Sequence, residues 1–282
     1  MLAPTSSRSV DPRLAAASGV MRDTVGAIHN LQHLLGSVRV GPKALARVVP
    51  DVHASCRPMI LAAGEMIEAA RNGPLSGPVR ELGELVVGRM AELESTLGQT
   101  SKSAFRASDR LSLETALASV VRDLDGALEL VELMVEASAT GRVPVAVSDV
   151  IRESANRLDT GSGRGRRLRV TFAAPGSAVL VRVNPRLALR LFAFAVAIPG
   201  SKDGVVVRTE ILGGVCNLRI SPRGINDTVP PGDRGGTVLV AVPPLIDLSR
   251  LCACEVARAT GSTLEASPTE RTSVLSLPLD PG

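Results

Sequence analysis

The chain has 282 residues, of which 45% are hydrophobic and 21% charged, and its formal net charge is +4. This length is enough for about two domains, and the composition is that of a globular protein with a buried core rather than a disordered chain. Tryptophan and tyrosine are absent and phenylalanine occurs four times, so the core must be aliphatic and the aromatic platforms of single-strand nucleic-acid binders are missing.

The sequence also indicates where the protein resides and which sites it lacks. The N-terminus has no basic segment followed by an apolar one, and the longest clean apolar run, LFAFAVAI, is too short to span a membrane. We therefore expect a cytoplasmic protein without membrane contact. The four cysteines lack the paired spacing of a zinc or redox site, and there are only three histidines, so we expect buried free thiols and no bound metal.

The first half of the chain has a helical pattern. Residues 1–12 are rich in Pro, Ser and Thr without periodicity, which predicts a disordered lead. Over residues 13–140, apolar side chains recur at three- and four-residue steps, which predicts four amphipathic helices in an antiparallel bundle. Pro50 and Pro58 punctuate the second helical segment.

The periodicity changes after a Gly/Pro linker at 141–144. A short helix follows, and then strand-like runs with two further helices between them. The expected strands are 168–174, 178–183, 204–212, 215–221, 236–245 and 272–279, and the expected helices are 185–198 and 247–260. Helices interleaved with mostly antiparallel strands predict the fold class α+β, with the N-terminal antiparallel helical bundle followed by an α/β sandwich over residues 145–282.

This order of elements resembles a two-component sensor histidine kinase without its sensor. The stretch IHNLQHLLGSV keeps the histidine, the leucine two residues later and the leucine pair of the family's phosphoacceptor helix, with Asn30 in place of an acidic residue. The segment DLDGALELVELMVEASATGRVPVAVSDVIRESANRL is similar to the family's second bundle helix, linker and first helix of the ATP-binding domain. The resemblance covers most of residues 14–280 and implies a Bergerat-like ATPase-type domain over 145–282.

Three nucleotide-binding motifs of the family are missing. The segment NPRLALRLFAFAVAIPG has alanine or phenylalanine at the asparagines that hold magnesium and phosphates, LRISPRGIND lacks the Asp-x-Gly that reads adenine, and LIDLSRLCACEVARATGSTL lacks the glycines of the lid-side helix. A triphosphate needs a divalent cation with oxygen ligands, and glycines that let backbone amides approach. We therefore expect a degenerate ATPase-like domain with no bound ATP, no other cofactor and no autokinase activity.

Two functions remain open. In the first, a response-regulator receiver domain, which supplies its own magnesium, passes a phosphoryl group to His29, so the protein is a histidine phosphotransferase. Gly26, His33 and Gly36 share the helical face of His29, and the two glycines would let receiver loops come close. In the second, the protein is an inert pseudokinase scaffold that binds signalling proteins, because Asn30 supplies no charge to orient and activate the imidazole.

Two other kinds of site are disfavoured. His29 and His33 are spaced to share a metal ion but lack a third ligand. The basic stretch GSGRGRRLRV is typical of a DNA-associated regulator, although a solvated loop is the better interpretation and nucleic acid is not the expected partner. The arginines concerned are Arg164, Arg166, Arg167 and Arg169.

The oligomeric state is open as well. The stretch between His29 and the segment DVIRES is about twice as long as the family needs. One chain can therefore supply all four helices and be a monomer, or the protein can form a homodimer as its relatives do. Residues 78–138 can also be an internal duplication of the first hairpin, with Arg122 at the histidine position.

Overall fold

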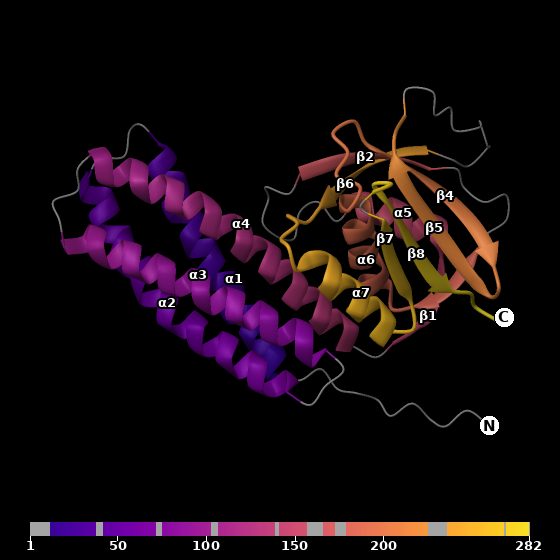
Figure 1. The fold of residues 1–282 in the computed structure, drawn as a ribbon, viewed down its shortest axis with the longest axis horizontal. Coiled ribbons are helices and arrows are strands. Elements are labelled where there is room, and N and C mark those ends of the chain that lie inside the picture. The colour runs from indigo at the N-terminus through magenta and orange to yellow at the C-terminus, as the bar shows by residue number, and fades with distance from the viewer. Residues whose placement is uncertain are drawn as a thin grey trace. The chain divides into compact units, whose positions relative to one another are not determined.

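The computed structural model describes residues 12–37, 42–71, 75–102, 107–138, 141–156, 166–172, 179–224, 236–267 and 269–281. The predicted fold class, a helical bundle followed by an α/β sandwich, is confirmed (Figure 1). The chain divides into two compact units, Asp11–Glu132 and Leu133–Gly282. The disordered lead expected at residues 1–12 lies outside the described residues except at Pro12, where the first helix begins.

The first unit is built from four long helices of one chain. They are α1 (Pro12–Gly36), α2 (Pro42–Ala70), α3 (Ser76–Lys102) and α4 (Ala107–Ser138), of which α4 continues into the second unit. Helix α1 packs on α2 and α2 on α3 (Figure 1). Each helix buries an aliphatic stripe at helical spacing, which in α1 consists of Met21, Val25, Ile28, Leu31 and Leu35, all at most 3% exposed.

Helix α2 runs without a break through Pro50 and Pro58, so the predicted interruption of the helix at these prolines is wrong. A proline inside a helix lacks an N–H donor, and its ring presses on the carbonyl of the preceding turn. Both prolines are exposed, and on the solvent side of a helix such carbonyls can tilt outward to water. The buried side chains of Val52 and Met59 keep the apolar face continuous across both positions.

The second unit contains a six-stranded and a two-stranded sheet with three helices of its own. Its elements are β1 (Val143–Ala146), α5 (Val147–Asn156), β2 (Arg166–Phe172), β3 (Leu180–Val183), α6 (Pro185–Ala197), β4 (Val205–Leu212), β5 (Val215–Pro222), β6 (Gly236–Val242), α7 (Ser249–Ala259), β7 (Thr263–Ser267) and β8 (Thr272–Pro278). The large sheet has the order β6-β2-β4-β5-β8-β7, in which β2 and β4 are parallel and the other neighbours antiparallel. Strands β1 and β3 form the antiparallel pair.

The sequence failed to predict two strands. Strand β1 overlaps the expected Gly/Pro linker and contains Pro144, which a strand at a sheet edge tolerates because one of its sides needs no backbone donor. Strand β7 has one fully buried large side chain, Leu264, so its alternation was too weak to recognise.

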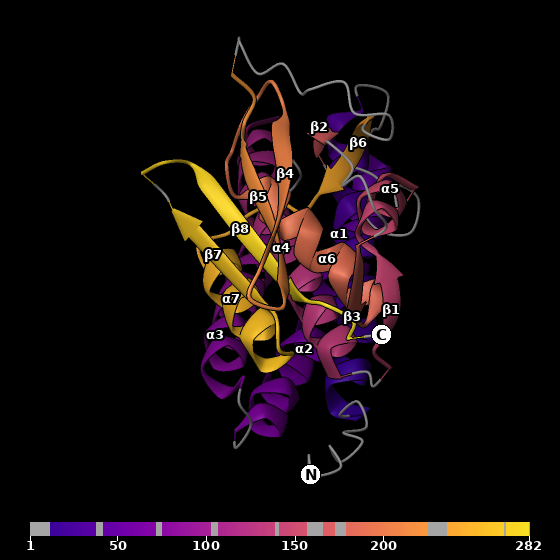
Figure 2. The same ribbon diagram turned by 90° about the vertical axis from the view of Figure 1, so that its right-hand side faces the viewer.

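One face of the large sheet is covered by α5, α6 and α7 (Figure 2). Alternate residues of β2, β5 and β8 enter this core, where they meet two phenylalanines of α6. The core between the sheet and the helices includes Leu168, Val170, Phe172, Phe192, Phe194, Leu218, Ile220, Leu275 and Leu277, all at most 2% exposed. The opposite face of the sheet carries the intervening residues, many of which are polar and exposed.

All four cysteines are free, and Cys56, Cys216 and Cys252 are buried, which confirms the prediction of buried free thiols for these three. Cys254 is half-buried. Burial, assisted by the charge of Glu94, raises the pKa of Cys56 to about 12. Burial alone raises the pKa of Cys216 to about 11. Because thiolate is the reactive form, both thiols are inert at neutral pH.

From the raised pKa values of these two thiols we predict how the free energy of unfolding changes at alkaline pH. In the unfolded chain they lose protons near pH 8.5, whereas the folded chain retains them to about 11 or 12, so stability is full below the unfolded pKa and falls as pH rises above it. The expected slope reaches about 1.4 kcal/mol per pH unit for each thiol. Cys56→Ser retains a donor for the Val52 carbonyl, which Cys56 Sγ contacts at 3.4 Å, and should make the fall shallower. Urea denaturation between about pH 7 and about pH 10.5 measures the free energy of unfolding as a function of pH. The same pH dependence in the variant and the wild type would contradict the prediction.

Candidate functional site

His29 lies at the edge of the buried stripe of α1 and faces α4. Its Nε2 atom is 2.9 Å from Oδ1 of Asp125, and the two side chains are 16% and 12% exposed. A carboxylate at this distance accepts a hydrogen bond from the imidazole and fixes the orientation and tautomer of the ring. Asp125 therefore supplies, from another helix, the acidic partner that Asn30 does not provide.

The second nitrogen of this ring is shielded. His29 Nδ1 is buried and has no hydrogen-bond partner among the described residues. When Nε2–H donates to Asp125, the lone pair of the neutral ring resides on Nδ1. Neither nitrogen is then both free and exposed, so His29 has to turn away from Asp125 before it can react with another protein.

A second contact joins the same two helices. Arg22 Nη2 donates to Glu132 Oε1 at 2.8 Å. Arg22 precedes His29 by two helical turns, and Glu132 follows Asp125 by the same interval, so the helices run antiparallel with both contacts in one row. We refer to Arg22, His29, Asp125 and Glu132 as the α1–α4 clasp.

The other predicted site residues remain on the surface next to the clasp. Gly26, Asn30, His33 and Gly36 are all exposed. An added Cβ at Gly26 or Gly36 meets nothing within 4 Å, so a partner can approach the helix closely at both positions. In the part of the chain that the structure describes, no three His, Cys, Asp or Glu side chains come together as metal ligands.

Two aspartates of α4 were missed as partners of other helices. Besides Asp125, Asp123 is 6% exposed and accepts hydrogen bonds from Arg89 of α3, with Nε and Nη2 both 2.8 Å from Oδ2. Hydrogen bonding to Glu92 raises the pKa of the Arg89 guanidinium, and Asp123 contributes to the same rise. The sequence does place both aspartates next to Leu124, in the apolar stripe of α4. Because a buried carboxylate requires a partner, this position could have indicated that each aspartate has one, but the sequence does not say which residue it is.

The helix that matches the magnesium-binding segment of the family is used for packing. Asn184 caps α6, since its Oδ1 accepts from the backbone N–H of Arg186 at 3.0 Å and of Leu187 at 3.3 Å. Farther along, Phe192 and Phe194 are 0% and 1% exposed. The polar side chains of α6 itself are arginines, which offer no oxygen ligands.

Among the helices of the described residues, none combines the length and apolarity that a membrane crossing requires.

No protein-family profile and no curated protein sequence matches the chain. Solved structures similar to it include the histidine kinase AdeS of Acinetobacter baumannii, which is 13% identical with a TM-score of 0.37 over 71% of this chain and 96% of that one. A histidine kinase from Burkholderia phymatum STM815 is 15% identical with a TM-score of 0.34 over 72% of this chain and 99% of that one. Both are histidine kinases, the family that the sequence resembles, and at these TM-scores neither places a residue of the site.

Proposed function

We propose that this protein is a histidine-kinase-like adaptor of two-component signalling, which binds response-regulator receiver domains without ATP chemistry. The observation that carries the proposal is the state of His29, whose Nε2 is bound to Asp125 and whose Nδ1 is buried. A phosphoacceptor nitrogen must be reachable by its partner. In this arrangement His29 holds α1 to α4 instead.

The composition of α6 supports the same proposal. A bound triphosphate needs a magnesium ion with oxygen ligands. The segment's amide, Asn184, caps the helix, and Phe192 and Phe194 belong to the core. Replacing these side chains with ligands would open a cavity in the sheet core, so the domain is suited to packing rather than to nucleotide binding.

The surface that would receive a partner lies on α1. Gly26 and Gly36 are exposed one turn before and two turns after His29, with open space above both. A glycine on a helix surface exposes backbone and allows close approach by a facing loop. We assign the docking of receiver domains to this surface, together with Asn30 and His33.

A second candidate function is phosphotransfer through His29, and the Asp125 carboxylate favours it. In this version the bond between phosphorus and a receiver's aspartyl oxygen breaks, a bond between phosphorus and an imidazole nitrogen forms, and the receiver carboxylate is released. The ring first turns away from Asp125, the lone pair of one ring nitrogen attacks phosphorus, and the N–H proton of the phosphorylated ring passes to water. Before that turn, the hydrogen bond to Asp125 fixes which ring nitrogen carries the lone pair.

Receiver domains carrying radiolabelled aspartyl phosphate distinguish the two functions. The receivers of the same organism are purified singly and mixed with the full chain. We expect at least one to bind, and we expect no stable label on the wild-type chain or on Asp125→Asn, because His29 is held in the bundle. His29→Ala should retain receiver binding. Label that appears on the wild type and disappears in His29→Ala would establish phosphotransfer instead.

A pair of glycine variants tests the docking surface. Gly26→Arg places a bulky charge on the proposed surface and should weaken receiver binding about tenfold or more. Gly88→Arg makes the same change at an exposed position of α3 with equal space, and should leave binding within about twofold. Equal effects of the two variants, or no receiver that binds the wild type, would rule out docking on α1.

A further inference from the structure

The face of the large sheet opposite its helices carries arginines on neighbouring strands. In β2, Leu168 and Val170 enter the core, so Arg167 and Arg169 project from the open face and are exposed. Leu239 of β6 lies opposite Arg169 in the sheet register and is 48% exposed. Arg167 and Arg169 are two positions apart in the strand, so their guanidinium groups lie on the same surface of the sheet.

The arginine-rich stretch of the sequence therefore does not act as one cluster. Arg166 lies on the other side of β2 and donates through Nη2 to the backbone carbonyl of Ser201, so it serves the fold. Arg164 lies outside the described residues. Arg167 and Arg169 are the two members that the structure places on the open face.

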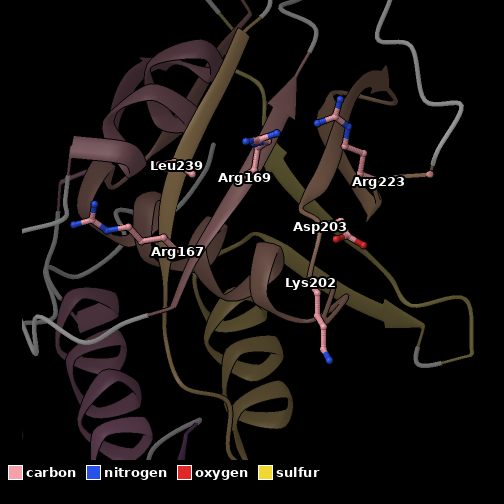
Figure 3. Close-up of a pocket in the computed structure, with 7 residues that line it drawn as sticks. Arg167, Arg169, Lys202, Asp203, Arg223 and Leu239 are labelled. Atoms are coloured by element: carbon pink, nitrogen blue, oxygen red, sulfur yellow. The ribbon is translucent and has the colours of Figure 1, made fainter.

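These two arginines border a hollow of about 560 Å³ (Figure 3). Lys202 and Asp203, from the loop between α6 and β4, and Arg223, which follows β5, complete its charged lining. The described lining residues, four cations and one carboxylate, carry a net charge of +3 at neutral pH. In Figure 3, Arg169 and Arg223 extend toward the same side, with Arg167 and Lys202 at the margins. The volume is in the range of small-molecule sites, which span about 300–1,000 Å³.

Backbone contacts hold this lining in place. Gly204 has a φ of +106°, and a Cβ at that position would overlap the backbone carbonyl of Arg169, so the loop lies directly against β2. The backbone N–H of Arg223 donates to the Gly204 carbonyl at 3.0 Å. Because Arg166 also holds Ser201 at the start of the same loop, the backbones of the three segments that carry the cations are fixed to one another.

The cations of the hollow are not held by ion pairs in the described part of the chain. Within the residues that the structure describes, none of Arg167, Arg169, Lys202 and Arg223 forms an ion pair. Like charges around a concave surface raise the local positive potential and attract anions. No aromatic ring is present among the described residues that line the hollow, so a nucleobase would find no stacking partner in them.

We propose that this hollow binds a small polyanion with two or more linked phosphate groups, with Arg169 and Arg223 as its principal ligands. Guanidinium groups bind phosphate oxygens through two parallel hydrogen bonds, and two of them suit two neighbouring phosphates. The proposal is independent of the receiver-docking function, since the two sites are on different units of the chain. The same phosphate chemistry occurs in free oligophosphates and in a nucleic-acid backbone, and the lack of aromatic side chains among the described lining residues favours the former.

Calorimetric titration of the full chain with inorganic tripolyphosphate at low salt tests the site. We expect binding that is weaker by about tenfold or more in Arg169→Gln and in Arg223→Gln, the usual effect of losing a charged hydrogen bond. The matched control is Arg219→Gln, because Arg219 is exposed on β5 but does not line the hollow. It should change affinity by no more than about twofold. Equal losses in all three variants would show diffuse charge attraction and overturn the site.

A variant that binds more tightly distinguishes a change at the site from misfolding. Asp203→Asn removes the carboxylate found among the described lining residues and should tighten tripolyphosphate binding several-fold, a result that loss of structure cannot produce. A short DNA duplex is titrated in parallel. Tighter binding of the duplex than of tripolyphosphate, with all three arginine variants weakened, would make the face a nucleic-acid surface and overturn the oligophosphate site. Failure of tripolyphosphate to bind at about millimolar concentration would overturn it as well.

Discussion

Replacing Gly204 with alanine is expected to lower the free energy of unfolding of the second unit by about 3 kcal/mol or more. The φ of Gly204 is +106°, outside the range that other residues adopt without strain. The new Cβ would also overlap the backbone carbonyl of Arg169, which the β2 ladder holds in place. Because the chain has no tryptophan or tyrosine, urea denaturation followed by far-ultraviolet circular dichroism is the appropriate measurement.

Gly213→Ala is the matched control for this variant. Gly213 has a φ of +59°, so alanine is again unfavourable, but nothing lies within 4 Å of the added Cβ. Its expected effect is about 1 kcal/mol, the ordinary penalty of a left-handed residue. The difference between the two variants measures the overlap with β2, and equal losses would mean that the loop at Gly204 relaxes freely.

Replacing Arg89 with alanine should destabilise the bundle by about 3 kcal/mol. The variant leaves Asp123, which is 6% exposed, without the guanidinium that donates to its Oδ2 at 2.8 Å. An ionised carboxylate in that position keeps its desolvation cost and loses its closest partner, while exposed Arg122, with Nε 3.5 Å from Oδ1, remains. We place the effect at the lower end for buried pairs because the Arg89 side chain is 33% exposed and water screens part of the interaction. Urea denaturation at neutral pH measures the loss.

Two further variants show whether burial causes this loss. Arg80→Ala removes an exposed arginine of the same helix, whose Nε is 3.8 Å from Glu84, and should change stability by less than about 0.5 kcal/mol. Exchange of both Arg89 and Asp123 for leucine removes the buried charge altogether and should recover most of the lost stability. A double variant as unstable as Arg89→Ala would show that packing, rather than the unpaired carboxylate, explains the result.

The regular parts of the fold could be predicted from the sequence because their signal is local. The stripe of α1, with Met21, Ile28 and Leu35, repeats at helical spacing and is buried as a whole. Strands β2, β4 and β5 alternate or are continuously apolar, and each was predicted near its observed bounds. Pro50 and Pro58 misled because a proline's effect depends on which side of the helix it faces, and that is decided by the packing.

The sites could be predicted only in part, because their contacts join distant segments. The sequence singled out His29, but its partner Asp125 is 96 residues away and has no motif of its own. The basic stretch pointed to Arg167 and Arg169, whereas Lys202 and Arg223 are isolated charges that the sheet brings to them. Residue spacing reports which side chains share an element; it does not report which elements become neighbours.

The long sequence separation of the α1–α4 clasp also bears on the rates of folding and unfolding. Arg22 and Glu132 are 110 residues apart, whereas α1 packs on α2 and α2 on α3, their immediate successors. Contacts between distant residues close large loops and tend to form after local ones. Interactions that are absent from the transition state slow unfolding without speeding folding. We therefore expect that loss of the clasp affects the rate at which the bundle unfolds more than the rate at which it folds.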